Sequence, residues 1–137
     1  MRFMFYECNP LISLNLTMFD TSKVKYMERM FYGCSSLTTL DLNNFKTSNV
    51  RGMDNMFRGC SSLISLNIDN FDTSLVEYMH YMFYSCSSLI SLNLINFNTY
   101  KIPFYSEMFY NVNEKIAFLY WYFKKFNTFI TNKKFYY

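Results

Sequence analysis

The sequence has few of the residues that most enzymes use for chemistry. It contains one histidine, His80, and only three glycines among its 137 residues. A lone histidine, in a chain with no nucleophile motif and no Gly-rich phosphate loop, does not meet the minimum geometry for acid–base or covalent catalysis. We therefore expect a protein that is not an enzyme.

The sequence also lacks a long apolar run and a strong charge of one sign. Its apolar run at residues 116–123 is far shorter than the roughly 20 residues that span a bilayer. The net charge is +3, but residues 1–107 carry 8 Lys and Arg against 9 Asp and Glu, which leaves −1. Residues 108–137 carry 5 against 1, a charge of +4. Because the repeats have no basic stripe, we expect no nucleic-acid partner.

What the chain has instead is a repeat of 26 residues. Four full units begin at Met4, Met30, Met56 and Met82, and a truncated fifth begins at Met108. Each unit opens with Met-Phe, and the full units continue with a ladder of Leu or Ile and then Phe at fixed positions. A unit of this size cannot bury its own apolar face and must stack on its neighbours, so we predict a solenoid over residues 1–110.

The apolar spacing inside one unit changes from that of a strand to that of a helix. Leu40 and Leu42 are two residues apart, as on one face of a strand, whereas Val50, Met53 and Met56 follow at three-residue steps. Each coil is therefore predicted to contain one parallel β-strand and a short helix, which gives an α/β fold class. The Asp-Thr-Ser and Lys-Thr-Ser triplets are expected to cap that helix. A brief second strand near Val50, giving a flatter coil, is the alternative.

One unit, residues 30–55, reads Met-Phe-Tyr-Gly-Cys-Ser-Ser-Leu-Thr-Thr-Leu-Asp-Leu-Asn-Asn-Phe-Lys-Thr-Ser-Asn-Val-Arg-Gly-Met-Asp-Asn. This pattern recurs in phase from residue 4 to about residue 110 and resembles the BspA-type leucine-rich repeat of bacterial surface proteins and lipoproteins. The resemblance implies a right-handed leucine-rich-repeat solenoid with parallel strands, displayed outside the cell and used for adhesion or protein contact. It implies no catalytic residue.

The usual export signal of that family is missing from these residues. The chain starts inside a repeat, without the charged, apolar and small-residue segments of a signal peptide, and the early Cys8 belongs to the repeat. The resemblance implies a cell-surface or extracellular location. Two alternatives stand beside it, namely a fragment of a longer surface protein and a cytoplasmic copy.

The four cysteines occupy one position of successive units, and Val112 fills that position in the fifth. They are Cys8, Cys34, Cys60 and Cys86. A position that accepts valine is apolar, so we expect a buried column of free thiols, with disulfides between neighbours geometrically marginal. We expect no metal or other cofactor, because the chain has no Cys-x-x-Cys and its single histidine is not placed with the cysteines.

Two further positions of the unit carry polar or aromatic side chains. His80 shares its position with Glu28, Asp54 and Ser106, so we expect a solvated residue on the outer side of the short helix. Tyrosine follows the Phe in four units, and Arg58 replaces it in the third. These tyrosines are expected either to pack along the stack or to form an exposed adhesive strip.

The residues between and beside the inward leucines should form three columns on the outer surface of the sheet. They are Ser13, Asn15 and Thr17; Thr39, Asp41 and Asn43; Ser65, Asn67 and Asp69; and Ser91, Asn93 and Ile95. Short polar side chains lose little rotamer entropy on binding, so these columns are the candidate site for a protein ligand, such as a host or neighbouring-cell surface protein. The columns could equally solvate the sheet or bond one another along the stack.

Residues 111–137 leave the repeat and are rich in aromatic and basic residues. They could form a capping helix over the last coil, contact a membrane through residues 116–134, or be degenerate sequence beyond the repeats. The predicted function is a protein-interaction or adhesion module. A membrane-peripheral structural protein held by the tail, and a degenerate fragment of a longer surface protein, are the alternatives.

Overall fold

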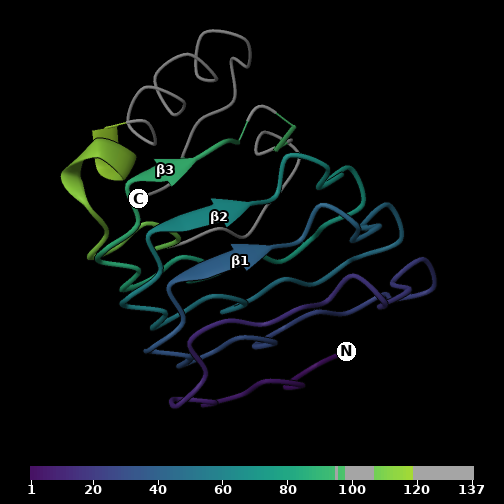
Figure 1. The fold of residues 1–137 in the computed structure, drawn as a ribbon. Helices are drawn as coiled ribbons and strands as arrows, with labels where there is room; N and C mark the ends of the chain where they lie inside the picture. The colour runs from purple at the N-terminus through teal and green to yellow at the C-terminus, as the bar shows by residue number, and fades with distance from the viewer. Residues whose placement is uncertain (95, 98–106, 119–137) are drawn as a thin grey trace, which may run out of the picture.

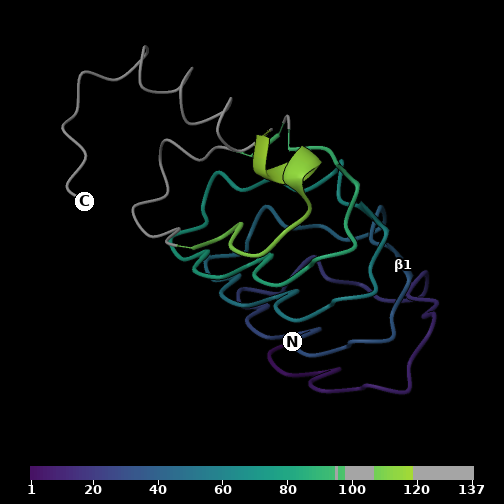
Figure 2. The same ribbon diagram turned by 90° about the vertical axis from the view of Figure 1, so that its left-hand side faces the viewer.

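The computed structural model describes residues 1–94, 96–97 and 107–118, and Figure 1 shows their arrangement. Successive 26-residue units lie side by side along one axis, from the N-terminal unit to the unit that carries β3. Figure 2 shows the same units from the side, each as one loop of chain beside the next. Ile95 of the predicted columns and residues 119–137 of the predicted tail lie outside the described residues.

Three of the units contribute one short strand each to a parallel sheet. The strands are β1 (Thr39–Asp41), β2 (Ser65–Asn67) and β3 (Ser91–Leu92), in the order β1-β2-β3. Leu40 pairs with Leu66 and Leu66 pairs with Leu92, so the sheet register is the 26-residue repeat itself. With one short helix at residues 114–118, the described chain has a mixed α/β structure.

The short helix predicted in every unit is wrong for the described repeats. Residues 28–33, 54–59 and 80–85 form consecutive turns instead. Alternate N–H groups there donate to carbonyl oxygens of the following unit, and the groups between them donate three residues back in their own unit. The pairs between units are Arg29 with Asp54 at 2.9 Å, Phe31 with Met56 at 2.9 Å, and Gly33 with Arg58 at 2.7 Å. An N–H group that is donated along the stack is not available for a helical hydrogen bond.

The flatter coil, the alternative to a helix in each unit, is closer to the structure. Single-residue parallel bridges join Tyr26 to Gly52 and Gly52 to Tyr78, just before the turns begin. Three-residue steps between apolar side chains suit these turns as well as they suit a helix, because each turn returns one side chain to the interior. The spacing alone therefore could not separate the two structures.

Two backbone positions of every unit adopt left-handed conformations. One series is Phe3, Arg29, Asn55, Tyr81 and Glu107, and the other is Glu7, Gly33, Gly59, Ser85 and Asn111. At Arg29 and Gly33, for example, hydrogen bonds from Met30 to Met27 and from Cys34 to Phe31 make the left-handed residue the third of a turn, and a turn with positive φ at that residue is of type II. Glycine or asparagine suits such a residue, but the first series carries bulky side chains at four of its five positions. The surrounding ladder between units therefore holds these residues in an unfavourable conformation.

The core is a set of side-chain columns that run through the units. Phe31, Phe57 and Phe83 are fully buried and stack with ring centroids 5.6 Å apart. The first unit is less complete, because several of its apolar side chains, such as Phe5, Leu11 and Leu14, are only partly buried and it forms no strand. At the other end Ile116, on the helix at residues 114–118, is 1% exposed and belongs to the core. Whether residues 111–137 form the predicted cap stays a prediction.

The turn geometry predicts that variants at Gly59 differ in stability in the opposite order to the one expected in a helix. Its φ of 77° suits glycine best, then asparagine, which holds the equivalent position at Asn111 with φ 54°. Gly59→Ala is therefore expected to lower the free energy of unfolding by about 1–2 kcal/mol, and Gly59→Asn by less. Urea unfolding measures both. In a helix, alanine would be more stable than glycine and asparagine less stable than alanine, so that order would contradict the turn assignment.

Candidate functional site

The predicted columns lie on the exposed face of the sheet. Thr39 and Asp41 are exposed on either side of the buried Leu40, and Ser65 is exposed beside the buried Leu66. The parallel register places Thr39 beside Ser65 and Asp41 beside Asn67. We call this surface the strand face. It forms an open depression of about 410 Å³.

The depression gathers most, but not all, of the predicted residues. The lining side chains are Thr39, Leu40, Asp41, Ser65, Leu66, Asn67, Asp69, Ser91 and Asn93. The remaining predicted residues are exposed but lie outside the depression, and they are Ser13, Asn15, Thr17 and Asn43. Three of these belong to the first unit, which forms no strand. The candidate site is therefore centred on β1, β2 and β3.

Side chains of the middle column, the one that contains Asn15 and Asp41, also accept hydrogen bonds from the backbone. The Oδ1 atom of Asp41 accepts a hydrogen bond from the N–H of Asn43 at 3.0 Å, and Asn15 accepts one from the N–H of Thr17 at the same distance. Such Asx turns bend the chain as it leaves the sheet. Substitutions that test binding must keep an acceptor in this column.

A ladder of asparagines that sequence reasoning missed lies beside the strand face. The Nδ2 groups of Asn44, Asn70 and Asn96 donate to backbone oxygens of the preceding unit. Their acceptors are the carbonyls of Leu16 at 2.9 Å, Asn43 at 2.7 Å and Asp69 at 2.6 Å. The signal was present in the sequence, since these asparagines are 26 residues apart.

The threonines of the predicted helix caps have a different role. Thr47 is buried, and its hydroxyl accepts from the N–H of Asp72 at 2.8 Å and donates to the carbonyl of Asp72 at 3.0 Å. Thr21 makes the same pair of bonds with Lys46. With no helix to cap, these hydroxyls join neighbouring units. The adjacent Asp72 accepts from the N–H of Ser74, a hydrogen bond that lowers the pKa of its carboxyl.

A column of exposed isoleucines, also missed from the sequence, flanks the strand face. Ile12, Ile64 and Ile90 are 63%, 46% and 51% exposed, and each directly precedes a serine of the predicted first column. Thr38 holds the position in the second unit, and backbone hydrogen bonds link its N–H to Ile12 and its carbonyl to the N–H of Ile64. We call these three side chains the isoleucine strip.

The cysteines are free and lie in the predicted column. Cys34, Cys60 and Cys86 are buried, and Cys8 at the end of the stack is half-buried. Each buried thiol donates to a backbone oxygen of the preceding unit, as Cys60 does to Phe31 at 3.1 Å. Burial raises the pKa of Cys34 to about 11 and that of Cys86 to about 12. The three buried thiols are therefore neutral packing groups and not nucleophiles.

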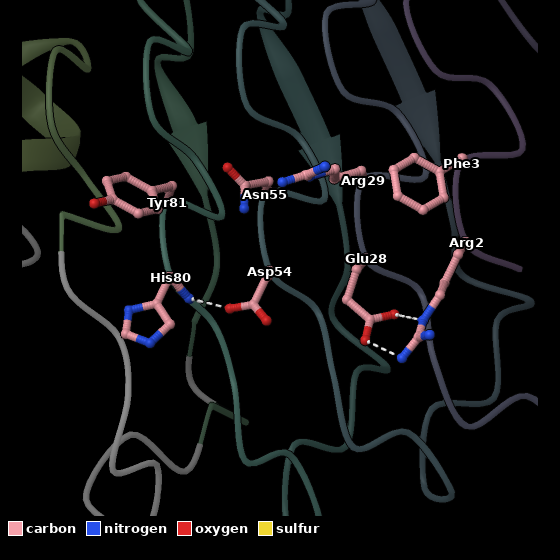
Figure 3. Close-up of a pocket in the computed structure, with 8 residues that line it drawn as sticks. All are labelled: Arg2, Phe3, Glu28, Arg29, Asp54, Asn55, His80 and Tyr81. Atoms are coloured by element: carbon pink, nitrogen blue, oxygen red, sulfur yellow. Dashed lines mark hydrogen bonds and ion pairs between the residues drawn. The ribbon is translucent and has the colours of Figure 1, made fainter.

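A second depression, of about 530 Å³, lies on the turn side of the units (Figure 3). Glu28 forms a bidentate ion pair with Arg2, at 2.8 and 3.0 Å, and Asp54 accepts from the N–H of His80 at 2.8 Å. Burial raises the pKa of the Asp54 carboxyl. His80, which also lines this depression, is half-buried and not the fully solvated residue expected from the sequence. In the described part of the chain, no three His, Cys, Asp or Glu side chains are grouped to hold a metal ion.

The tyrosines form a stacked column on the outside of the turns. Tyr6 stacks on Tyr32 at 4.9 Å and Tyr84 stacks on Tyr110 at 5.0 Å, with interplanar angles of 10° and 18°. Arg58 bridges the two pairs, since its guanidinium lies 5.8 Å from the Tyr32 ring and 4.5 Å from the Tyr84 ring. The rings are thus engaged with one another, which favours packing over an adhesive strip.

Thr47 provides a test of the ladder that joins the units. Thr47→Val keeps the shape but leaves the N–H of Asp72 without its acceptor, so we expect a loss of about 1–3 kcal/mol in the free energy of unfolding. Thr47→Ser keeps the hydroxyl and should retain most of that stability. Chemical denaturation compares the two variants. Equal losses would mean that the methyl group, and not the hydrogen bonds, accounts for the effect.

Thiol labelling tests the buried column. At pH 8 a maleimide reagent is expected to modify Cys8 quickly in the native protein, while the other three thiols react only after unfolding in guanidinium. Mass spectrometry counts the modified thiols, and Cys8→Ala should remove the native-state reaction. Rapid modification of two or more thiols in the folded protein would contradict the buried column.

The chain matches a protein family over most of its length. The family described as "Mycoplasma protein of unknown function, DUF285" matches residues 1–121. No curated protein and no solved structure matches the chain. Among the residues that the structure describes, none forms a helix long and apolar enough to cross a membrane.

Proposed function

The chain belongs to this DUF285 family, whose description assigns no activity, and we propose that it is a protein-interaction module without catalysis. The observation that carries the proposal is the strand face, where short polar side chains from three units stand exposed over one open depression. Polar groups placed in a concave surface are the part of a binding site that fixes the orientation of a ligand and provides specificity.

The proposed fold is a right-handed leucine-rich-repeat solenoid of the BspA type. Parallel strands in a 26-residue register, with inward Leu40, Leu66 and Leu92, support it. In this fold a partner contacts side chains that come from several coils at once. The proposed setting, on the resemblance of the repeats to surface proteins, is the outside of a cell, where the module would take part in adhesion.

The strand face is well suited to binding because little of it must be ordered when a partner arrives. Its backbone is held by the sheet and its middle column by Asx turns. Serine, threonine and asparagine side chains have few rotamers to lose. A rigid surface with short polar groups therefore spends less of its interaction energy on ordering than a flexible surface would.

The experiment is a selection in which the ligand need not be identified beforehand. Random peptides displayed on phage are selected on the immobilised full chain, and the enriched peptides are tested on Ser65→Tyr. This substitution covers the centre of the strand face with a side chain that exposed strands tolerate. We expect the affinity for the enriched peptides to fall at least about tenfold, which corresponds to a loss of about 1.4 kcal/mol in binding free energy.

The matched control is Ser48→Tyr, which places the same side chain at an exposed serine in a turn away from the depression. It should bind the enriched peptides as the unmodified chain does, and both variants should keep the unfolding midpoint. Peptides that bind Ser65→Tyr at full strength would move the interaction surface off the strand face and refute the proposal.

A further inference from the structure

The strand face has the chemistry of a site for a basic polypeptide. We propose that it binds an extended segment in which Lys or Arg alternates with aliphatic side chains. This inference rests on the proposed function and specifies the partner's chemistry. It follows from the charges on the face, from the isoleucine strip beside it and from the shape of the depression.

Every ionisable side chain that lines the depression is an acid. Asp41 and Asp69 carry two negative charges, and the remaining lining residues are Ser, Thr, Asn and Leu. Both aspartates are exposed, and no ion pair of the described residues involves either carboxylate. Two acids outside the depression are paired, since Glu28 forms an ion pair with Arg2 and Glu77 forms one with Arg51 at 2.8 Å. The strand face thus presents uncompensated negative charge to a partner.

The isoleucine strip adds an apolar contact at the edge of the polar columns. Ile64 and Ile90 belong to adjacent units, whose strands are about 4.8 Å apart, and each stays about half exposed. A partner that covers both the aspartates and the strip needs cationic and aliphatic groups close together. An extended polypeptide supplies them, because neighbouring side chains along a strand point to different sides and alternate ones to the same side.

Other classes of partner fit less well. Nucleic acids and anionic lipid surfaces would be repelled by Asp41 and Asp69. A sugar ring usually packs against an aromatic face, and no aromatic side chain lines the depression. The depression is open and spans three units, which suits a chain lying across the strands better than a small molecule that needs enclosure.

The repeat itself supplies variants that remove the charge and keep the fold. Asparagine occupies the position of Asp41 in three other units, at Asn15, Asn67 and Asn93, and it occupies the position of Asp69 at Asn43. Asp41→Asn also retains the oxygen that accepts from the N–H of Asn43. The double variant Asp41→Asn/Asp69→Asn therefore changes the charge of the face with little effect on its geometry.

The test measures binding of two short fluorescent peptides to the full chain by polarisation at low salt. One repeats Lys-Val-Lys-Thr, and the other has Glu in place of Lys. We expect the lysine peptide alone to bind, and the double variant to weaken it at least about tenfold. The matched control is Asp20→Asn/Asp72→Asn, which removes two charges from Asx turns outside the depression and should leave binding unchanged.

Three results would overturn the inference. They are equal binding of the two peptides, unchanged binding to the Asp41→Asn/Asp69→Asn variant, and an equal loss in the control variant, which would indicate attraction by overall charge. Ser65→Tyr separates this failure from that of the proposed function. If peptides selected on the chain lose binding to Ser65→Tyr but carry no basic residues, the strand face is an interaction surface and only the basic partner is wrong.

Discussion

The hydrogen bond from a backbone N–H in one unit to a carbonyl of the next is the interaction on which the rest of the structure depends. On the turn side the N–H of Phe31 donates to Met56 and that of Phe57 donates to Met82, so each unit is donor to its successor. The period of these bonds aligns every position with its equivalent in the neighbouring unit. Once this register is set, a residue repeated every 26 positions must form a straight column.

The columns explain how buried polar groups such as the Thr47 hydroxyl find hydrogen-bond partners beside apolar side chains. Thr47 and Cys60 are both buried, and each finds its partner on the backbone of an adjacent unit. The same arrangement makes the two ends different from the middle. Phe5 in the first unit is only partly buried whereas Phe31 is fully buried, and at the other end Ile116 is buried and belongs to the core. Stability should therefore be lowest in the first unit.

The sequence was sufficient for the register, the core columns and the position of the strand face, because all three depend only on the period and on the alternation of Leu with polar residues. It was not sufficient for the turns. Val50, Met53 and Met56 have the spacing of a helix face, and left-handed residues such as Arg29 and Tyr81 are not glycines that would reveal a turn. The isoleucine strip and Asn70 were within reach of the repeat pattern. The depression around Asp41 and Asp69 required the structure, since it depends on how adjacent units meet.

A surface built from one position per unit can change its chemistry without changing its frame. The repeat position of Asp41 holds asparagine in the other units. Asp41 and Asn15 form the same Asx turn, because the side-chain oxygen of each accepts from the N–H two residues further on. Charge on the strand face is thus independent of the hydrogen bonds that support it. A single Asp in place of Asn adds an attraction for cations at almost no cost in stability, because the residue is exposed and the acceptor is kept. For this reason the two aspartates, and not the polar columns as a whole, are the residues expected to distinguish one partner from another.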